Sequence, residues 1–210
     1  MARPETSPID YYYSPISAFA YLGEAELRRI ARRHRQVVRY LPIDLDRVRA
    51  TLGLAMPADL GDARRSYRLV ELNRWSRQRR LEIRLKPLHW PIASPLAARL
   101  IHAAELTGLD PGPLSQALLR AVWCEDRNIA DLGDLRDLVD TAGFDPDKLL
   151  ALADTNAVIE RFEAATEAAI RRGVFGSPTY FWRGEMFYGQ DRLDFLDRAI
   201  AAARRAERPR

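Results

Sequence analysis

Between residues 9 and 42, the spacing of hydrophobic positions changes from strand-like to helical and back again. Residues 9–13 form a run of branched and aromatic side chains, which is typical of a strand. From Ala18 onward the apolar residues recur every three or four positions, as on one face of a helix. Residues 37–41 return to strand character before Pro42. The pattern predicts a β-α-β unit with two parallel strands and a right-handed crossover.

The middle of the chain, residues 58–172, is mostly helical in pattern, and prolines and glycines divide it into segments. Two amphipathic faces stand out within it. One consists of Leu114, Ala117, Leu118, Ala121 and Val122, and the other of Val158, Phe162, Ala165, Ala169 and Ile170. We therefore expect an all-helical segment between two parts that contain strands.

The end of the chain returns to strand character. Residues 179–182 and 186–188 are predicted strands, and the turn between them contains Gly184. A final helix follows, with Leu193, Leu196 and Ile200 on one face. The predicted order is therefore β-α-β, then helices, then β-β-α.

The composition limits the class of protein. Hydrophobic residues make up 47% of the 210 positions, enough for a compact core. No run of about 18 apolar residues occurs, so we expect no membrane span. The first residues contain no apolar segment of the kind found in secretory signals, so we expect a cytoplasmic location.

The net charge of +4 raises the alternative of a nucleic-acid-binding protein. The arginines are interleaved with aspartates and glutamates in amphipathic patterns, which is typical of solvated helix faces. We therefore expect no nucleic acid as a partner, although a local positive potential would attract an anionic substrate. Cys124 is the single cysteine, which excludes an intramolecular disulfide, and the three histidines lack metal-ligand spacing. We expect no metal.

Ser17 follows the first predicted strand and opens the first predicted helix. A serine there is first of all a helix N-cap, because its oxygen accepts a hydrogen bond from a free backbone N–H. The same position carries the partial positive charge of a helix N-terminus, which would stabilise a thiolate brought from outside the chain. The surroundings contain no paired histidine and aspartate, so a hydrolase triad is not indicated.

Four segments resemble, in order, those of one group of proteins. They are residues 10–22 (DYYYSPISAFAYL), 71–75 (ELNRW), 175–181 (FGSPTYF) and 188–193 (YGQDRL). The chain resembles 2-hydroxychromene-2-carboxylate isomerases and kappa-class glutathione transferases of the DsbA-like family over nearly its whole length. The resemblance implies an α/β, thioredoxin-like fold with a large all-helical insertion. Residues 1–55 and 171–210 would form the two parts of the thioredoxin-like domain, and residues 56–170 the insertion.

The chain departs from these relatives at two places. Ala18 stands where they usually carry a proline after the catalytic serine. The loop at residues 56–62 lacks an asparagine that relatives often use near the active site. The first departure concerns the shape of the loop, and the second concerns the identity of the substrate.

The resemblance implies glutathione as cofactor, with Ser17 as the catalytic residue that holds its thiolate. It also implies a cis peptide bond before Pro178, so that the backbone of Ser177 pairs with the cysteinyl backbone of glutathione. The remaining contacts would come from residues 188–191, namely Tyr188, Gly189, Gln190 and Asp191. Asp191 would accept the γ-glutamyl ammonium, and backbone N–H groups around Gln190 would bind the carboxylate. Apart from the resemblance, Asp191 is favoured there as a helix cap.

Three further positions concern the anionic and aromatic parts of the ligands. Arg64, or Arg65 beside it, falls where relatives present a basic residue to the glycyl carboxylate of glutathione. Arg49 aligns with a basic residue that relatives use near the substrate. His89 and Trp90 lie in a proline-bounded loop where an aromatic side chain would stack on a bicyclic substrate. The alternatives are solvated helix arginines and a buried tryptophan that anchors the loop.

The first functional hypothesis is therefore a glutathione-dependent isomerase of the 2-hydroxychromene-2-carboxylate type, acting on a small aromatic carboxylate. The second is a kappa-class-like glutathione S-transferase, since the thiolate site would be the same. The third is a non-catalytic DsbA-like module that binds thiols or peptides. The resemblance also implies a homodimer.

Overall fold

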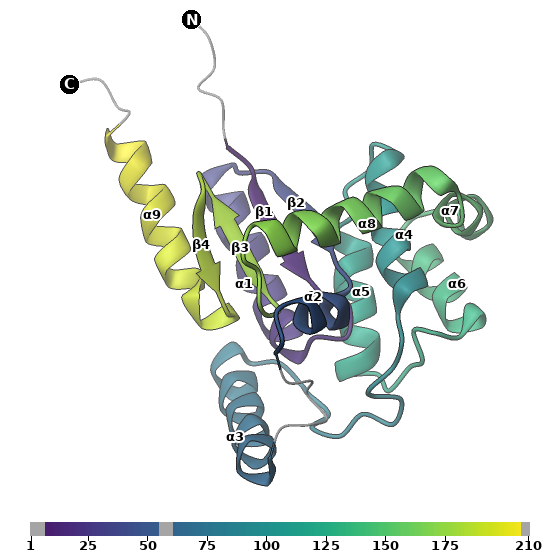
Figure 1. Cartoon of the computed structure of the whole chain (residues 1–210), viewed down its shortest axis with the longest axis horizontal. Coiled ribbons are helices and arrows are strands. Elements are labelled where there is room, and N and C mark those ends of the chain that lie inside the picture. Colours follow the sequence, from purple (N-terminus) through teal and green to yellow (C-terminus); the bar gives the residue numbers. More distant parts are fainter. Residues whose placement is uncertain (1–6, 55–60, 207–210) are drawn as a thin grey trace, which may run out of the picture.

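The structure is a computed structural model that describes residues 7–54 and 61–206. Four strands and ten helical segments appear in the order β-α-β, helices, β-β-α within these residues (Figure 1). The first part contains β1 (Ile9–Tyr13), α1 (Ala18–His34), β2 (Val38–Pro42) and α2 (Leu45–Thr51). The helices that follow are α3 (Asp62–Arg79), α4 (Pro95–Leu106), α5 (Gly112–Trp123), α6 (Leu132–Thr141), α7 (Pro146–Ala153) and α8 (Asn156–Arg171). The last part contains β3 (Thr179–Trp182), β4 (Glu185–Tyr188), the 3-10 turn η2 (Gln190–Arg192) and α9 (Leu193–Ala206).

The four strands form one mixed sheet in the order β2-β1-β3-β4. β1 and β2 run parallel, with Ile9 opposite Val38, which confirms the predicted β-α-β unit. β3 is antiparallel to β1 and forms a hairpin with β4, as the sequence predicts. This is the thioredoxin-like α/β fold with a helical segment between its two parts.

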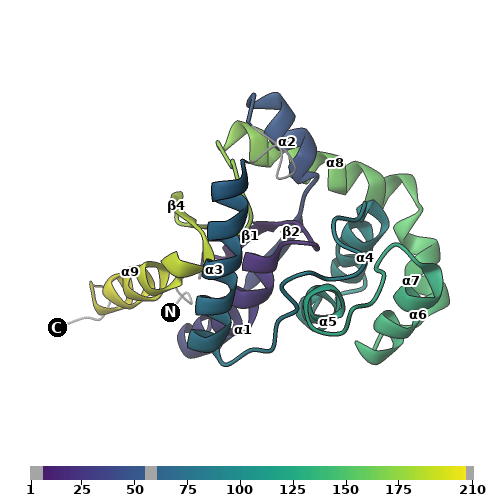
Figure 2. The same ribbon diagram turned by 90° about the horizontal axis from the view of Figure 1, so that it is seen from below.

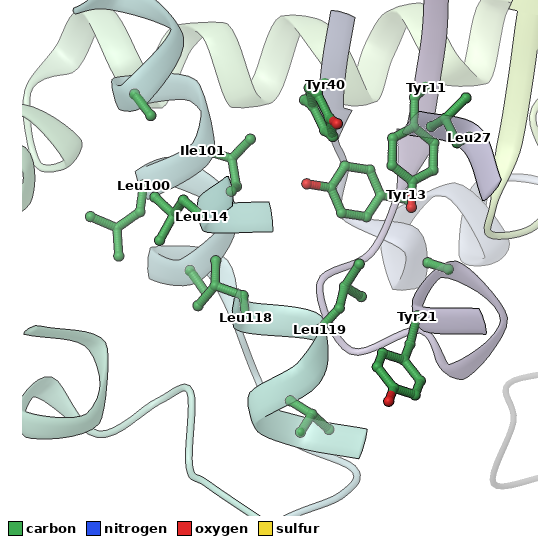
Figure 3. Packing of buried hydrophobic residues seen from close by; sticks show 14 of the residues in the cluster. Tyr11, Tyr13, Tyr21, Leu27, Tyr40, Leu100, Ile101, Leu114, Leu118 and Leu119 are labelled. Carbon is green, nitrogen blue, oxygen red and sulfur yellow. The ribbon is translucent and has the colours of Figure 1, made fainter. Parts of the chain in front are cut away.

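β1 is buried on both faces, and its side chains divide between two cores. Tyr11 and Tyr13 stack on each other, with ring centroids 4.1 Å apart, and belong to the core that contains α1 and α5 (Figure 3). Tyr12 belongs to the second core, with Val48 of α2 and Ala169 of α8. The larger core is continuous from the sheet into the leucines of α4 and α5, so the helical segment packs directly against the thioredoxin-like part.

The short helix α2 is one element that the sequence pattern did not predict, because seven residues give too little periodicity. Its beginning is nevertheless encoded locally. Asp44 is the N-cap, and its carboxylate accepts a hydrogen bond from the backbone N–H of Arg47 at 2.9 Å.

Helix α3 is held at its C-terminal end by a single arginine. The guanidinium of Arg79 donates to the side-chain oxygen of Gln190 at 3.1 and 3.2 Å and to its backbone oxygen at 3.2 Å. Gln190 is buried, and it also contacts α1 closely at Gly23. This contact fixes α3 against α1. In Figure 2, α3 and α4 lie on opposite sides of the ends of β1 and β2, and α2 lies above them.

None of the helices in residues 7–54 and 61–206 is long and apolar enough to cross a membrane. The same residues contain no cluster of three or more side chains suited to hold a metal ion. The cytoplasmic location stays a prediction.

Candidate active site

A cleft of about 820 Å³ opens where β1 ends and α1 begins. Its walls come from the N-terminal end of α1, from α2, from the first half of α3 and from the start of α4. The loop before β3, the end of β4, the loop that carries Trp90 and one residue of α8, Phe162, complete it. The parallel pair brings the ends of β1 and β2 to the same edge of the sheet, and this is the edge that α2, α3 and α4 surround (Figure 2).

Ser17 lies in this cleft and caps α1, as the sequence predicts. Its Oγ accepts a hydrogen bond from the backbone N–H of Ala20 at 3.2 Å. The same hydroxyl donates to the backbone oxygen of Ser177, also at 3.2 Å. The first turn of α1 contains no acidic residue, so no carboxylate on that turn offsets the positive end of the helix dipole.

The loop before β3 lies directly beside the loop that carries Ser17. The Ser177–Pro178 peptide bond is cis, and the Ser177 hydroxyl accepts a hydrogen bond from the backbone N–H of Ser14 at 3.0 Å. Two hydrogen bonds therefore connect this loop with the loop that carries Ser17. Ser177 lines the cleft, whereas Pro178 is buried behind it.

Tyr188 lines the cleft from the end of β4. Its ring covers Gly176, where an added Cβ would lie 2.7 Å from the phenol oxygen and 2.8 Å from Cζ. It also packs against Phe175, with ring centroids 4.4 Å apart. The absence of a side chain at Gly176 is what lets the tyrosine ring approach the loop this closely.

Gly189, Gln190 and Asp191 are not among the residues that line the cleft. Gln190 is buried and bound by Arg79, so its side chain links α3 to η2. Gly189 has a φ of 95°, and an added Cβ would collide with Oδ1 of Asp191. The carboxylate of Asp191 forms an ion pair with Arg192 at 2.9 Å.

The two predicted cations both line the cleft, from different walls. Arg49 projects from α2, and its Nε is buried without a hydrogen-bond partner in the described part of the chain. Arg64 lies exposed in the first turn of α3. Arg65, the alternative, forms an ion pair with Asp62 and is not among the lining residues. The geometry therefore favours Arg64 over Arg65 as a ligand group.

Of the two residues predicted in the proline-bounded loop, His89 and Trp90, only Trp90 lines the cleft. Trp90 lines the cleft and packs against Trp123, with ring centroids 5.7 Å apart. His89 is not a lining residue. Only one of the two predicted residues therefore reaches the cleft.

Arg68 is a lining residue that the sequence analysis did not single out. Its guanidinium lies 4.9 Å from the ring centroid of Trp90 and 5.5 Å from that of Trp123. Burial lowers the pKa of this guanidinium below its usual value. The signal was available, because Arg64, Arg68 and Glu71 are spaced by four and three residues and so share one face of α3.

Residues 56–60 of the loop that lacks the asparagine lie outside the described residues, so that departure from the relatives has no structural account. The departure at Ala18 does: Ala18 is buried in the first turn of α1, directly after the Ser17 cap.

The family of the DSBA-like thioredoxin domain matches residues 8–201 of the chain. The 2-hydroxychromene-2-carboxylate isomerase of Pseudomonas sp. (strain C18) is 32% identical over 199 residues, which cover 93% of this chain and 91% of the relative. The isomerase of the same name from Sphingobium xenophagum is 29% identical over 194 residues, which cover 91% and 97%.

Solved structures give the same picture. A structure of 2-hydroxychromene-2-carboxylate isomerase has a TM-score of 0.82 at 29% identity, and the match covers 94% of this chain and 96% of that chain. A probable DsbA oxidoreductase from Streptomyces coelicolor has a TM-score of 0.76 at 19% identity, with coverages of 97% and 92%, and shares the fold.

Proposed function

The chain belongs to the family of the DSBA-like thioredoxin domain and, within it, to the 2-hydroxychromene-2-carboxylate isomerases, and we propose that it is a glutathione-dependent isomerase of a small aromatic carboxylate. The substrate is 2-hydroxychromene-2-carboxylate or a similar product of aromatic-ring breakdown. The observation that carries the proposal is the position of Ser17, whose hydroxyl lies in the wall of the cleft at the N-terminus of α1.

The residues present fit glutathione. A tripeptide thiol needs a hydroxyl or N–H donor for its sulfur, a backbone edge for its cysteinyl unit and a cation for its glycyl carboxylate. Ser17, Ser177 and Arg64 supply these groups, and all three line the same cleft. When bound, reduced glutathione supplies a thiolate that adds reversibly to the conjugated chain of the substrate and so makes a double bond rotatable.

The chain's own residues prepare this chemistry. The helix N-terminus and the Ser17 hydroxyl stabilise negative charge at one place, together by on the order of 2 kcal/mol. Arg49 binds the substrate carboxylate, which satisfies its buried Nε. Trp90 stacks on the aromatic ring of the substrate and excludes water from that side of the cleft.

Asp191 keeps its proposed contact with the γ-glutamyl ammonium, although it does not line the cleft. The ammonium would then replace Arg192 as the partner of the carboxylate. The proposed homodimer is tested separately, by light scattering during size-exclusion chromatography.

Two measurements test the function. Calorimetry of the purified protein with reduced glutathione and with S-methylglutathione is expected to show tighter binding of the free thiol, because only the thiol can ionise at Ser17. If neither compound binds, the proposal is wrong.

The second measurement follows glutathione during turnover of a hydroxychromene carboxylate and of chlorodinitrobenzene. An isomerase uses glutathione without consuming it, whereas a kappa-class-like transferase consumes one equivalent for each product. Binding of glutathione without turnover of either compound identifies the non-catalytic module.

A further inference from the structure

Arg68 is a cation in the cleft wall to which neither a substrate group nor a protein group has been assigned. No hydrogen bond or ion pair of its side chain occurs among residues 7–54 and 61–206. Glu71, one turn further along α3, pairs with Arg74 and accepts a hydrogen bond from the indole nitrogen of Trp75. The carboxylate one turn along the same helix face is therefore already occupied.

The position of Arg68 is set by aromatic rings rather than by an anion. Its guanidinium lies over Trp90 and Trp123, and the indole of Trp123 donates to the backbone oxygen of Ile16 at 3.1 Å. Trp123 is fully buried. The two tryptophan rings therefore link Arg68 to Ile16, the residue directly before Ser17.

A guanidinium stacked on an indole keeps the N–H donors at its edge available for an anion. Arg68 and Arg49 approach the cleft from α3 and α2 respectively, and both lack a protein anion among the described residues. A flat ligand with one carboxylate satisfies only one of them. If Arg49 binds the carboxylate, Arg68 can bind only another atom of the ligand on which negative charge develops.

The proposed reaction creates such a place. When the pyran ring opens, the bond between C2 and the ring oxygen breaks, and its electron pair stays on the oxygen as a phenolate. The C2 hydroxyl loses its proton and becomes a ketone, and the phenolate finally takes up one proton. Atoms and charge balance, and in this ring-opening step the ring oxygen is the leaving oxygen on which negative charge develops.

We propose that Arg68 binds this ring oxygen and stabilises the phenolate as it forms, while Arg49 holds the carboxylate at the other end of the substrate. The assignment rests on the proposed function for the identity of the substrate. It makes Arg68 a catalytic residue that also selects ligands with an oxygen ortho to the conjugated chain.

The test uses 2-hydroxy-5-nitrocinnamate, whose nitrophenol changes colour when it ionises near neutrality, and it contains no glutathione. Wild-type protein is expected to lower the phenol pKa of the bound probe by about one unit or more, a tenfold or larger preference for the phenolate. The R68M variant loses this shift. Cinnamate, which lacks the hydroxyl, binds wild type and R68M alike.

The matched control is Arg77→Met, which removes the same charge from the exposed side of the same helix and keeps the shift. In the isomerase assay R68M is expected to lower kcat about 100-fold with a smaller effect on KM, and R68K to recover part of the loss. If R68M does not fold, R68Q replaces it.

An unchanged phenol pKa in the wild-type complex overturns the assignment whatever the variants do, as does an equal shift in wild type and a folded R68M or R68Q. Failure of the probe to bind the wild type also overturns it. None of these results depends on the binding of glutathione at Ser17. The role of Arg68 and the proposed function can therefore be contradicted independently of each other.

Discussion

The hydroxyl of Ser17 lies 3.2 Å from the backbone oxygen of Ser177, and it simultaneously accepts the N–H of Ala20 at the same distance. The side chain therefore joins two loops and caps a helix before any ligand arrives. A thiolate bound at Ser17 would accept the hydrogen bond that the hydroxyl now donates to Ser177. The backbone oxygen of Ser177 could then accept a hydrogen bond from the backbone of the ligand. The two roles, cap and thiolate donor, can be separated experimentally.

Ser17→Ala is expected to lower the free energy of unfolding by about 1 kcal/mol, because the helix loses its cap. It is also expected to lower isomerase activity by about 100-fold and to raise the pKa of the bound glutathione thiol, which is read from thiolate absorbance. Asp131→Ala is the control, since it removes the N-cap of α6, where Asp131 accepts from Asp134 at 3.0 Å. Equal activity losses in both variants would contradict a specific role for Ser17.

Arg64 is expected to recognise the glycyl carboxylate of glutathione. Wild-type protein should bind glutathione about tenfold tighter than its glycyl ethyl ester, because the ester removes the charge that the guanidinium binds. Arg64→Met abolishes the difference, whereas Arg65→Met, which removes the partner of Asp62 and leaves Arg64 in the cleft, keeps it. Calorimetry with both ligands measures the ratio, and a preference lost only in the Arg65 variant assigns the role to Arg65 instead.

Gly176→Ala is expected to displace the ring of Tyr188 from the cleft. The new Cβ would lie within 2.8 Å of the phenol oxygen and of Cζ, so the free energy of unfolding falls by about 1–3 kcal/mol. In the background of Tyr188→Ala the same change costs much less, since the ring is gone. Thermal unfolding of the four proteins of this double-mutant cycle gives the coupling energy, and strict additivity would show that ring and loop are independent.

Glu24 is expected to make stability depend on pH. It is buried in α1 near Tyr40, whose hydroxyl donates to it at 3.2 Å, and burial raises its pKa from 4.5 to about 7. The native state therefore holds a proton that the unfolded chain releases, and stability falls as the pH rises from about 4.5 to 7. Above pH 7 the full loss, on the order of 3 kcal/mol, remains.

Glu24→Gln removes the carboxyl group that titrates and should flatten this slope in urea unfolding between pH 5 and 8. Glu26→Gln is the control on the same helix, because the hydrogen bond from Arg29 lowers the pKa of Glu26 and its effect appears only in more acidic solution. A slope that survives in Glu24→Gln would assign the dependence to another group.

Much of the fold follows from local pattern. The alternation of Tyr11, Tyr12 and Tyr13 between two cores, the parallel pairing of β1 with β2 and the hairpin of β3 with β4 all agree with the periodicity read along the chain. The cap at Ser17 also follows from sequence, because a helix N-terminus needs an acceptor within three residues.

The site depended more on packing. Gln190 belongs to a segment that resembles a ligand-binding motif, yet it is buried and bound by Arg79. His89 is not among the residues that line the cleft, although its neighbour Trp90 is. Arg68 meets Trp90 and Trp123 only because α3 is fixed across from α4, with Trp123 at the end of α5.

The sequence by itself determined the order of strands and helices, the hydroxyl at the tip of α1 and the lack of any cysteine in that first turn. Only the tertiary structure decided which cations share a cleft and which of them lack an anionic partner. The physical reason is range: periodicity and capping act over a few residues, whereas a cleft is made by segments that contact one another across more than a hundred positions, as Ser17 and Ser177 do.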